Sequence, residues 1–122
     1  MKSTNSYDVI GGGTAGISAA LSAARAGAKT LLAEATYLLG GLASAGLVTY
    51  YLPLCDGDGT QLCRGIAEEL LLLAVSKGSG SPIPEAWRRG GTKAERRKKR
   101  YEAQFNPYMF AFLAERLRKD RI

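Results

Sequence analysis

The stretch YDVIGGGTAGISAALSAARAGAKTLLAEA, residues Tyr7–Ala35, decides the fold. Four residues that suit a short strand, Tyr7–Ile10, precede three consecutive glycines, and apolar residues then recur at helical spacing. Gly27 stands where a glycine commonly ends a helix. The next run, Lys29–Glu34, is short, largely apolar and closed by a carboxylate. We therefore predict, in order, a strand, a tight glycine turn, a helix and a second strand.

The glycines of this turn satisfy the pattern G-x-G-x-x-G, which is typical of dinucleotide-binding units when it lies between a strand and a helix. Gly11 permits the tight turn, Gly13 lets the backbone approach a pyrophosphate, and Gly16 allows the helix to pack closely on the strand. The N-terminus of the helix offers N–H groups and the positive end of its dipole to phosphate oxygens. The position of the motif therefore predicts a phosphate-binding turn.

A carboxylate ends the second predicted strand, because Glu34 follows its apolar residues. At this place a carboxylate accepts hydrogen bonds from a ribose diol, and it repels a 2′-phosphate, so NADP is disfavoured. The alternative is an exposed charge at the end of a strand. We predict an α/β fold in which a Rossmann-like βαβ dinucleotide-binding unit is followed by helices. The motif does not separate NAD from FAD.

The rest of the chain shows a loop and then mainly helical patterns. Tyr37–Leu54 is rich in glycine and then in β-branched and aromatic residues, which suggests a loop that runs into an extended piece. Ile66–Lys77 has acidic residues in its first turn and a glycine beyond its end, which predicts a helix. Thr92 and Glu95 form a capping-box pattern. Asn106 followed by proline predicts the start of a last helix.

Size and composition fit a globular domain. The chain has 122 residues, of which 46% are hydrophobic, and no stretch of eighteen uninterrupted apolar residues, so we expect no membrane span. The first residues lack the apolar core of a secretory signal, and we expect a cytoplasmic protein. The sequence has no histidine, which removes the commonest general base and metal ligand. Cys55 and Cys63 suit neither a disulfide framework nor a zinc site, so we expect no metal and two reduced thiols.

The net charge of +6 is concentrated in one segment. Residues 1–60 carry three basic and four acidic residues, whereas residues 61–122 carry fourteen and seven. Arg88–Arg100 contains eight basic residues and one glutamate. Such a cluster binds nucleic acid or acidic lipid in some proteins and is a solvated helix face in others. We expect the solvated face and do not expect a nucleic-acid partner.

Four segments together resemble a family of FAD-dependent oxidoreductases with a glutathione-reductase-like flavin domain. They are YDVIGGGTAGISAALSAARAGAKTLLAE, YLLGGLASAGLVTYYLPLCDGDGTQ, GIAEELL and FNPYMFAFLAERL. The resemblance covers nearly the whole chain in order, from Tyr7 to about Leu117, and it is most specific in the first 60 residues. It implies that the cofactor is FAD.

The resemblance also implies a set of cofactor-binding residues. The glycine turn and the amides behind it are expected to hold the FAD pyrophosphate, the carboxylate the adenosine ribose, and the second glycine pair is expected to run along the cofactor. The residues concerned are Gly11, Gly13, Thr14, Ala15, Gly16, Glu34, Gly40 and Gly41. For the second glycine pair the alternative is a plain flexible loop.

In the intact family, hydride passes from the substrate to the flavin, and the resemblance implies this reaction class. No catalytic residue is identified in this sequence. Tyr50, Tyr51 and Asp56 are polar enough to line a flavin, but we expect packing roles for them. Two alternatives stay open. One is a nucleotide-binding module without catalysis, and the other is a basic interaction protein that acts through Arg88–Arg100.

Two departures from the family bear on the cofactor site. Relatives usually have about two more apolar residues between Ile10 and Gly11, so the strand here is shorter by about 7 Å. Either the turn is pulled back along the sheet or Met1–Tyr7 is drawn into the strand. The family is also several hundred residues long, whereas this sequence stops in the helical pattern LRKDRI, Leu117–Ile122. We expect an N-terminal fragment with little activity alone.

This expectation divides the sequence into two parts of one incomplete FAD-binding domain. Residues 1–60 are expected to form the βαβ unit with its glycine loop. Residues 61–122 are expected to form a mainly helical continuation of the same domain.

Overall fold

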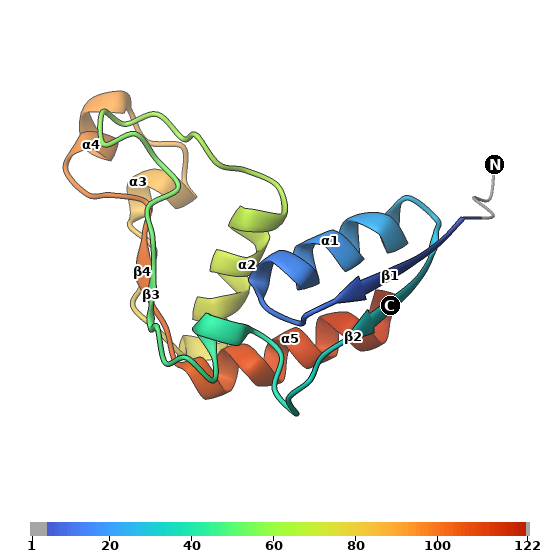
Figure 1. Cartoon of the computed structure of the whole chain (residues 1–122). Helices are drawn as coiled ribbons and strands as arrows, with labels where there is room; N and C mark the ends of the chain where they lie inside the picture. The colour runs from blue at the N-terminus through green and yellow to red at the C-terminus, as the bar shows by residue number, and fades with distance from the viewer. Residues whose placement is uncertain (1–4, 122) are drawn as a thin grey trace. The chain divides into compact units, whose positions relative to one another are not determined.

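The computed structural model describes residues 5–121, with the side chains of residues 5–117. Its contacts divide the chain into two compact units, which Figure 1 shows with their helices and strands labelled. The first unit comprises Met1–Val48 and Pro107–Ile122, and the second unit comprises Thr49–Asn106. The predicted division near residue 60 concerns the parts of a flavin domain, and it stays a prediction.

The first unit contains the strand, turn, helix and strand that the sequence predicts. Strand β1 (Ser6–Ile10) runs parallel to β2 (Lys29–Ala33), and helix α1 (Thr14–Arg25) connects them. Parallel neighbours need such a crossover, since a short hairpin cannot join them. Gly27, just beyond α1, has a φ of +89°, in the left-handed region that favours glycine. The mixed α/β class of the prediction is confirmed.

The short first strand is completed from its N-terminal side. Ser6 and Tyr7 pair with the first two residues of β2, and Ile10 pairs with its last residue, Ala33. The N–H of Gly11 then donates to the carbonyl oxygen of Ala33 at 2.7 Å. The glycine turn therefore begins level with the end of β2. Ser6 and Tyr7 belong to the strand, in line with one of the two predicted outcomes, and Met1–Thr4 lie outside the described residues.

Helices α1 and α5 (Pro107–Arg121) form the core of the first unit. Their buried side chains are Ile17, Ala20 and Leu21 from α1, and Phe110, Ala111, Leu113 and Ala114 from α5. The prediction that the last helix starts at Pro107 is confirmed, and Phe110 and Leu113 of this helix are buried. On the sheet, Ile10 is 80% exposed and Leu31 is 58% exposed.

The second unit is built on helix α2 (Ile66–Val75) and a small antiparallel pair, β3 (Tyr50–Tyr51) with β4 (Ala103–Gln104). Helix α2 ends two residues before the predicted Lys77. The chain then makes a 3-10 turn, η2 (Ser76–Gly78), in which Lys77 has a φ of +62°. A left-handed residue cannot continue an α-helix, so the helix stops before Lys77. Another 3-10 turn, η1 (Gly41–Ala43), belongs to the first unit.

An aromatic stack lies against the basic segment Arg88–Arg100 of the second unit. The rings of Trp87 and Tyr101 are stacked with centroids 5.1 Å apart, and the Arg96 guanidinium lies 5.1 Å from the Trp87 ring. Trp87 also donates its indole N–H to the carbonyl oxygen of Lys99 at 2.8 Å. Tyr101 donates its hydroxyl to Glu68 at 2.6 Å. Burial and this carboxylate raise the pKa of Tyr101 far above its ordinary value, so the hydroxyl keeps its proton.

Two short helices carry the first part of the basic segment. The structure confirms the capping box, in which Thr92 and Glu95 bond each other's backbone N–H groups at the start of α4 (Lys93–Arg97). Helix α3 (Glu85–Arg88) was not predicted, because four residues are too few to show a helical period. None of the helices among residues 5–121 has the length and apolar character needed to cross a membrane.

Candidate dinucleotide-binding site

The glycine turn has the backbone that a tight strand-to-helix connection needs. Gly11 has a φ of +100°, which L-residues with a side chain rarely adopt. Any Cβ at position 16 would overlap the carbonyl oxygen of Gly11, so α1 can approach the turn only because Gly16 has no side chain. The geometry predicted for these two glycines is therefore present. Their part in binding a ligand stays a prediction.

Gly12 connects the turn to the two other predicted pieces of the site. Its N–H donates to Oε2 of Glu34 at 2.5 Å, and its carbonyl oxygen accepts from the N–H of Gly40 at 2.8 Å. A Cβ at position 12 would collide with Leu39 and press on Glu34. The pattern G-x-G-x-x-G allows any residue at position 12, so the role of Gly12 was not predicted from the sequence. The only signal was that Gly12 is the middle of three consecutive glycines.

Two backbone N–H groups fix the Glu34 carboxylate beside the turn. Oε2 is held by Gly12, and Oε1 accepts from the N–H of Thr36 at 2.8 Å. The hydrogen bond from Thr36, followed by that from Gly12, lowers the pKa of Glu34 below its usual range. Glu34 is therefore ionised at neutral pH. Each oxygen keeps a further lone pair that can accept a hydrogen bond from a ligand hydroxyl.

The second glycine pair lies against the first. Gly40 forms an isolated parallel bridge with Gly13, and a Cβ on Gly41 would lie 3.0 Å from the Cα of Gly13. Gly40 has a φ of +111°, and a Cβ there would lie 3.1 Å from the ring of Phe110. Helix α5 thus supports this loop through one buried aromatic side chain. The part of this loop in binding a cofactor stays a prediction.

The predicted phosphate-binding end of the site consists of Gly13, Thr14 and Ala15. Gly13 caps α1 with φ −66° and ψ 178°, a backbone that any residue adopts, and a Cβ on it would have nothing within 4 Å. The chain itself therefore does not require glycine at position 13. No side chain caps this helix end, and its first turn carries no acidic residue. Such an end, with its N–H groups and positive dipole, suits a bound pyrophosphate.

The polar residues considered for a flavin face have other partners. Tyr50 donates its hydroxyl to Glu102 at 2.6 Å, and Tyr51 donates to the carbonyl oxygen of Ala67 at 2.7 Å. Asp56 accepts two backbone N–H groups of its own turn. These three residues belong to the second unit. The contact of Tyr51 fits the packing role expected from the sequence, whereas Asp56 is exposed and orders its own turn.

The parallel strands, the glycine turn and the carboxylate define a dinucleotide-binding βαβ unit. The family model described as FAD dependent oxidoreductase matches residues 8–121. The chain belongs to this family, and its cofactor is FAD. Searches of curated proteins and of solved structures found no significant match.

Proposed function

We propose that this chain is the FAD-binding portion of an oxidoreductase that moves hydride from a substrate to the flavin. The observation that supports it is the convergence of three separate sequence pieces on Gly12, which bonds both Glu34 and Gly40. Bound FAD supplies the redox chemistry, and the protein supplies binding, orientation and electrostatics.

Each group of predicted site residues has its own task in the proposal. The glycine turn and the first turn of α1 hold the pyrophosphate, because N–H groups at a helix start favour anions. The fixed, ionised carboxylate of Glu34 accepts the ribose hydroxyls of the adenosine. The second glycine pair lies along the cofactor. The full set is Gly11, Gly13, Thr14, Ala15, Gly16, Glu34, Gly40 and Gly41.

The proposal also includes the two predicted parts of the flavin domain, residues 1–60 and 61–122. The 122 residues by themselves are expected to show little turnover. The parallel sheet among the described residues has two strands, and Ile10 and Leu31 on it are exposed. A parallel sheet normally has both faces covered, so the exposure of these two residues supports the expectation of little turnover.

Position 13 allows the cofactor to be tested apart from folding. A valine at Gly13 meets no atom of the chain within 4 Å of its Cβ, yet it fills the space that the pyrophosphate needs. We expect Gly13→Val to weaken FAD binding at least about tenfold, which corresponds to about 1.4 kcal/mol. Quenching of flavin fluorescence measures the affinity, and circular dichroism shows that the variant is folded.

The matched control is Ala19→Val, which also adds a β-branched residue to an exposed position of α1. Its helix penalty is a few tenths of a kcal/mol, and we expect FAD affinity within about twofold of the unaltered protein. Equal FAD affinity in Gly13→Val and Ala19→Val contradicts the proposed function.

A further inference from the structure

Helix α5 reaches the candidate cofactor site through the side chain of Phe110. This side chain is fully buried, and its ring lies against Gly40, where a Cβ would be 3.1 Å from two ring carbons. Gly40 has a φ of +111°, which residues with a side chain rarely adopt. The close contact of ring and backbone therefore depends on both residues, because the glycine leaves the space that the ring fills.

The same glycine contacts the glycine turn of the first unit. The N–H of Gly40 donates to the carbonyl oxygen of Gly12 at 2.8 Å, and Gly40 forms a parallel bridge with Gly13. Gly12 in turn donates its own N–H to the Glu34 carboxylate. A continuous series of contacts thus runs from Phe110 through Gly40 and Gly12 to Glu34. All of these residues belong to the first unit.

The loop that follows Gly40 has little packing of its own. Leu42 is 74% exposed and Leu47 is 58% exposed. Ser44 is buried, but its hydroxyl donates to a carbonyl oxygen within the loop itself. Of the atoms nearest to a Cβ at Gly40, those outside the loop belong to Phe110. The position of Gly40 therefore depends on a side chain that comes from a distant part of the sequence.

We propose that Phe110 is a positioning residue for FAD, an inference that rests on the proposed function. Docking of α5 fixes Gly40, and through it Gly12 and Glu34, so that the cofactor meets a preformed site. Loss of the ring leaves a cavity into which the loop can relax. A shift of about 1 Å at Gly40 takes its N–H out of hydrogen-bonding distance of Gly12. Since linkage is reciprocal, bound FAD also stabilises the docked position of α5.

Amide hydrogen exchange of the full chain without FAD tests the contact itself. In Phe110→Leu we expect the Gly40 N–H to exchange at least about tenfold faster relative to the Leu21 N–H in the middle of α1, because local opening frees it from Gly12. The control is Leu113→Val, which also replaces a buried apolar side chain of α5 with a smaller one. It should leave this ratio unchanged, and an equal change in both variants overturns the inference.

Quenching of flavin fluorescence tests the effect on the cofactor. We expect Phe110→Leu to bind FAD about tenfold more weakly and Leu113→Val to bind within about twofold of the unaltered protein. Equal affinities in these two variants, while Gly13→Val still weakens FAD, overturn the inference and leave the proposed function standing. An unchanged affinity in Gly13→Val overturns both, so the two failures are distinguishable.

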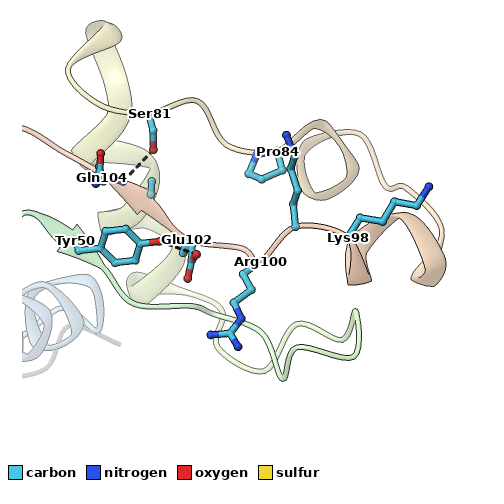
Figure 2. A pocket seen from close by; sticks show the side chains of 9 residues that line it. Tyr50, Ser81, Pro84, Lys98, Arg100, Glu102 and Gln104 are labelled. Carbon is cyan, nitrogen blue, oxygen red and sulfur yellow. Dashed lines mark hydrogen bonds between the residues drawn. The ribbon is translucent and has the colours of Figure 1, made fainter.

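A variant of the second unit serves as a remote control. Figure 2 shows the Tyr50 ring beside Glu102, to which its hydroxyl donates at 2.6 Å. Tyr50→Phe removes this hydrogen bond and keeps the ring, so Gly40 exchange and FAD affinity should match those of the unaltered protein. A loss of FAD affinity as large as in Phe110→Leu would overturn the inference, because perturbing either unit would then weaken FAD alike.

A last measurement needs no variant and decides the matter if circular dichroism shows that Phe110→Leu is not folded. In the unaltered protein, the Gly40 N–H should open together with the amides of α5 around Phe110, since the ring cannot leave without releasing the loop. Their exchange rates should therefore respond alike to added denaturant. Fast exchange of Gly40 that does not depend on denaturant, beside protected amides in α5, would overturn the inference.

Discussion

The glycine turn of the first unit and the aromatic stack of the second unit are built on opposite principles. At the turn, backbone groups make the contacts, and Gly12 and Gly16 leave no space for a Cβ. At the stack, side chains make the contacts, since Trp87 lies against Tyr101 and Arg96. Adding atoms should therefore damage the turn, whereas removing atoms should damage the stack.

The largest effect is expected for removal of the stack. Trp87→Ala leaves a cavity beside Tyr101 and deletes the hydrogen bond to the Lys99 carbonyl, so we expect a loss of about 3–5 kcal/mol in the free energy of unfolding. Denaturant unfolding followed by circular dichroism measures it. Trp87→Phe keeps most of the packing and should lose less. Equal losses in the two variants would mean that ring packing is not what stabilises this region.

The next effect is expected for added atoms at the turn. Gly16→Ala forces a Cβ onto the Gly11 carbonyl oxygen, and we expect about 1–3 kcal/mol of destabilisation from overpacking. Gly13→Ala meets no neighbour and should lose less than about 1 kcal/mol, the scale of a poor N-cap. Thermal unfolding compares the two. A reversed order would show that α1 does not pack on the turn as described.

A smaller effect concerns the fixed carboxylate. Glu34→Gln keeps the shape but removes the charge, and we expect FAD to bind about tenfold more weakly, the scale of a charge-assisted hydrogen bond. Folding should remain intact, because the amide oxygen of glutamine can still accept one of the two backbone N–H bonds that Glu34 accepts. Flavin fluorescence measures the affinity. An unchanged affinity would make Glu34 an ordinary charge at the end of a strand.

The same carboxylate gives a pH dependence with a definite sign. Because its two N–H donors favour the ionised form, the pKa of Glu34 is lowered, and its stabilising contribution is present above the ordinary glutamate pKa. The contribution is lost as the pH falls through the lowered value. Carbon-detected NMR of the carboxyl group should show this lowered midpoint, and Gly12→Ala should move it back upward. A midpoint at the ordinary value in the unaltered protein contradicts the fixed geometry.

The smallest effect is expected at the capping box. Thr92→Ala removes the side-chain acceptor for the N–H of Glu95 and should cost about 1 kcal/mol of unfolding free energy. Thr92→Ser keeps the hydroxyl and should behave like the unaltered protein. Thermal unfolding compares the two variants. Identical midpoints for Thr92→Ala and Thr92→Ser would mean that the capping box does not stabilise α4.

The features that could be predicted from the sequence follow local rules. The turn at Gly11, the helix start at Pro107 and the capping box at Thr92 each depend on residues within a few positions of one another. The role of Gly12 and the stacking of Trp87 on Tyr101 depend on where distant segments meet. No local pattern states such contacts. The ion pairs of Lys93 and Arg97 with Asp58 could not be predicted for the same reason, because Asp58 comes from elsewhere in the chain.

The claim that the glycine turn holds the cofactor is tested most directly by NMR of the backbone amides during a titration with FAD. This measurement locates even weak binding. The predicted result is that the largest shifts fall on Gly12–Gly16 and beside Glu34, and that they disappear in Gly13→Val. Shifts confined to residues of the second unit, or shifts in the turn that persist in Gly13→Val, would contradict it.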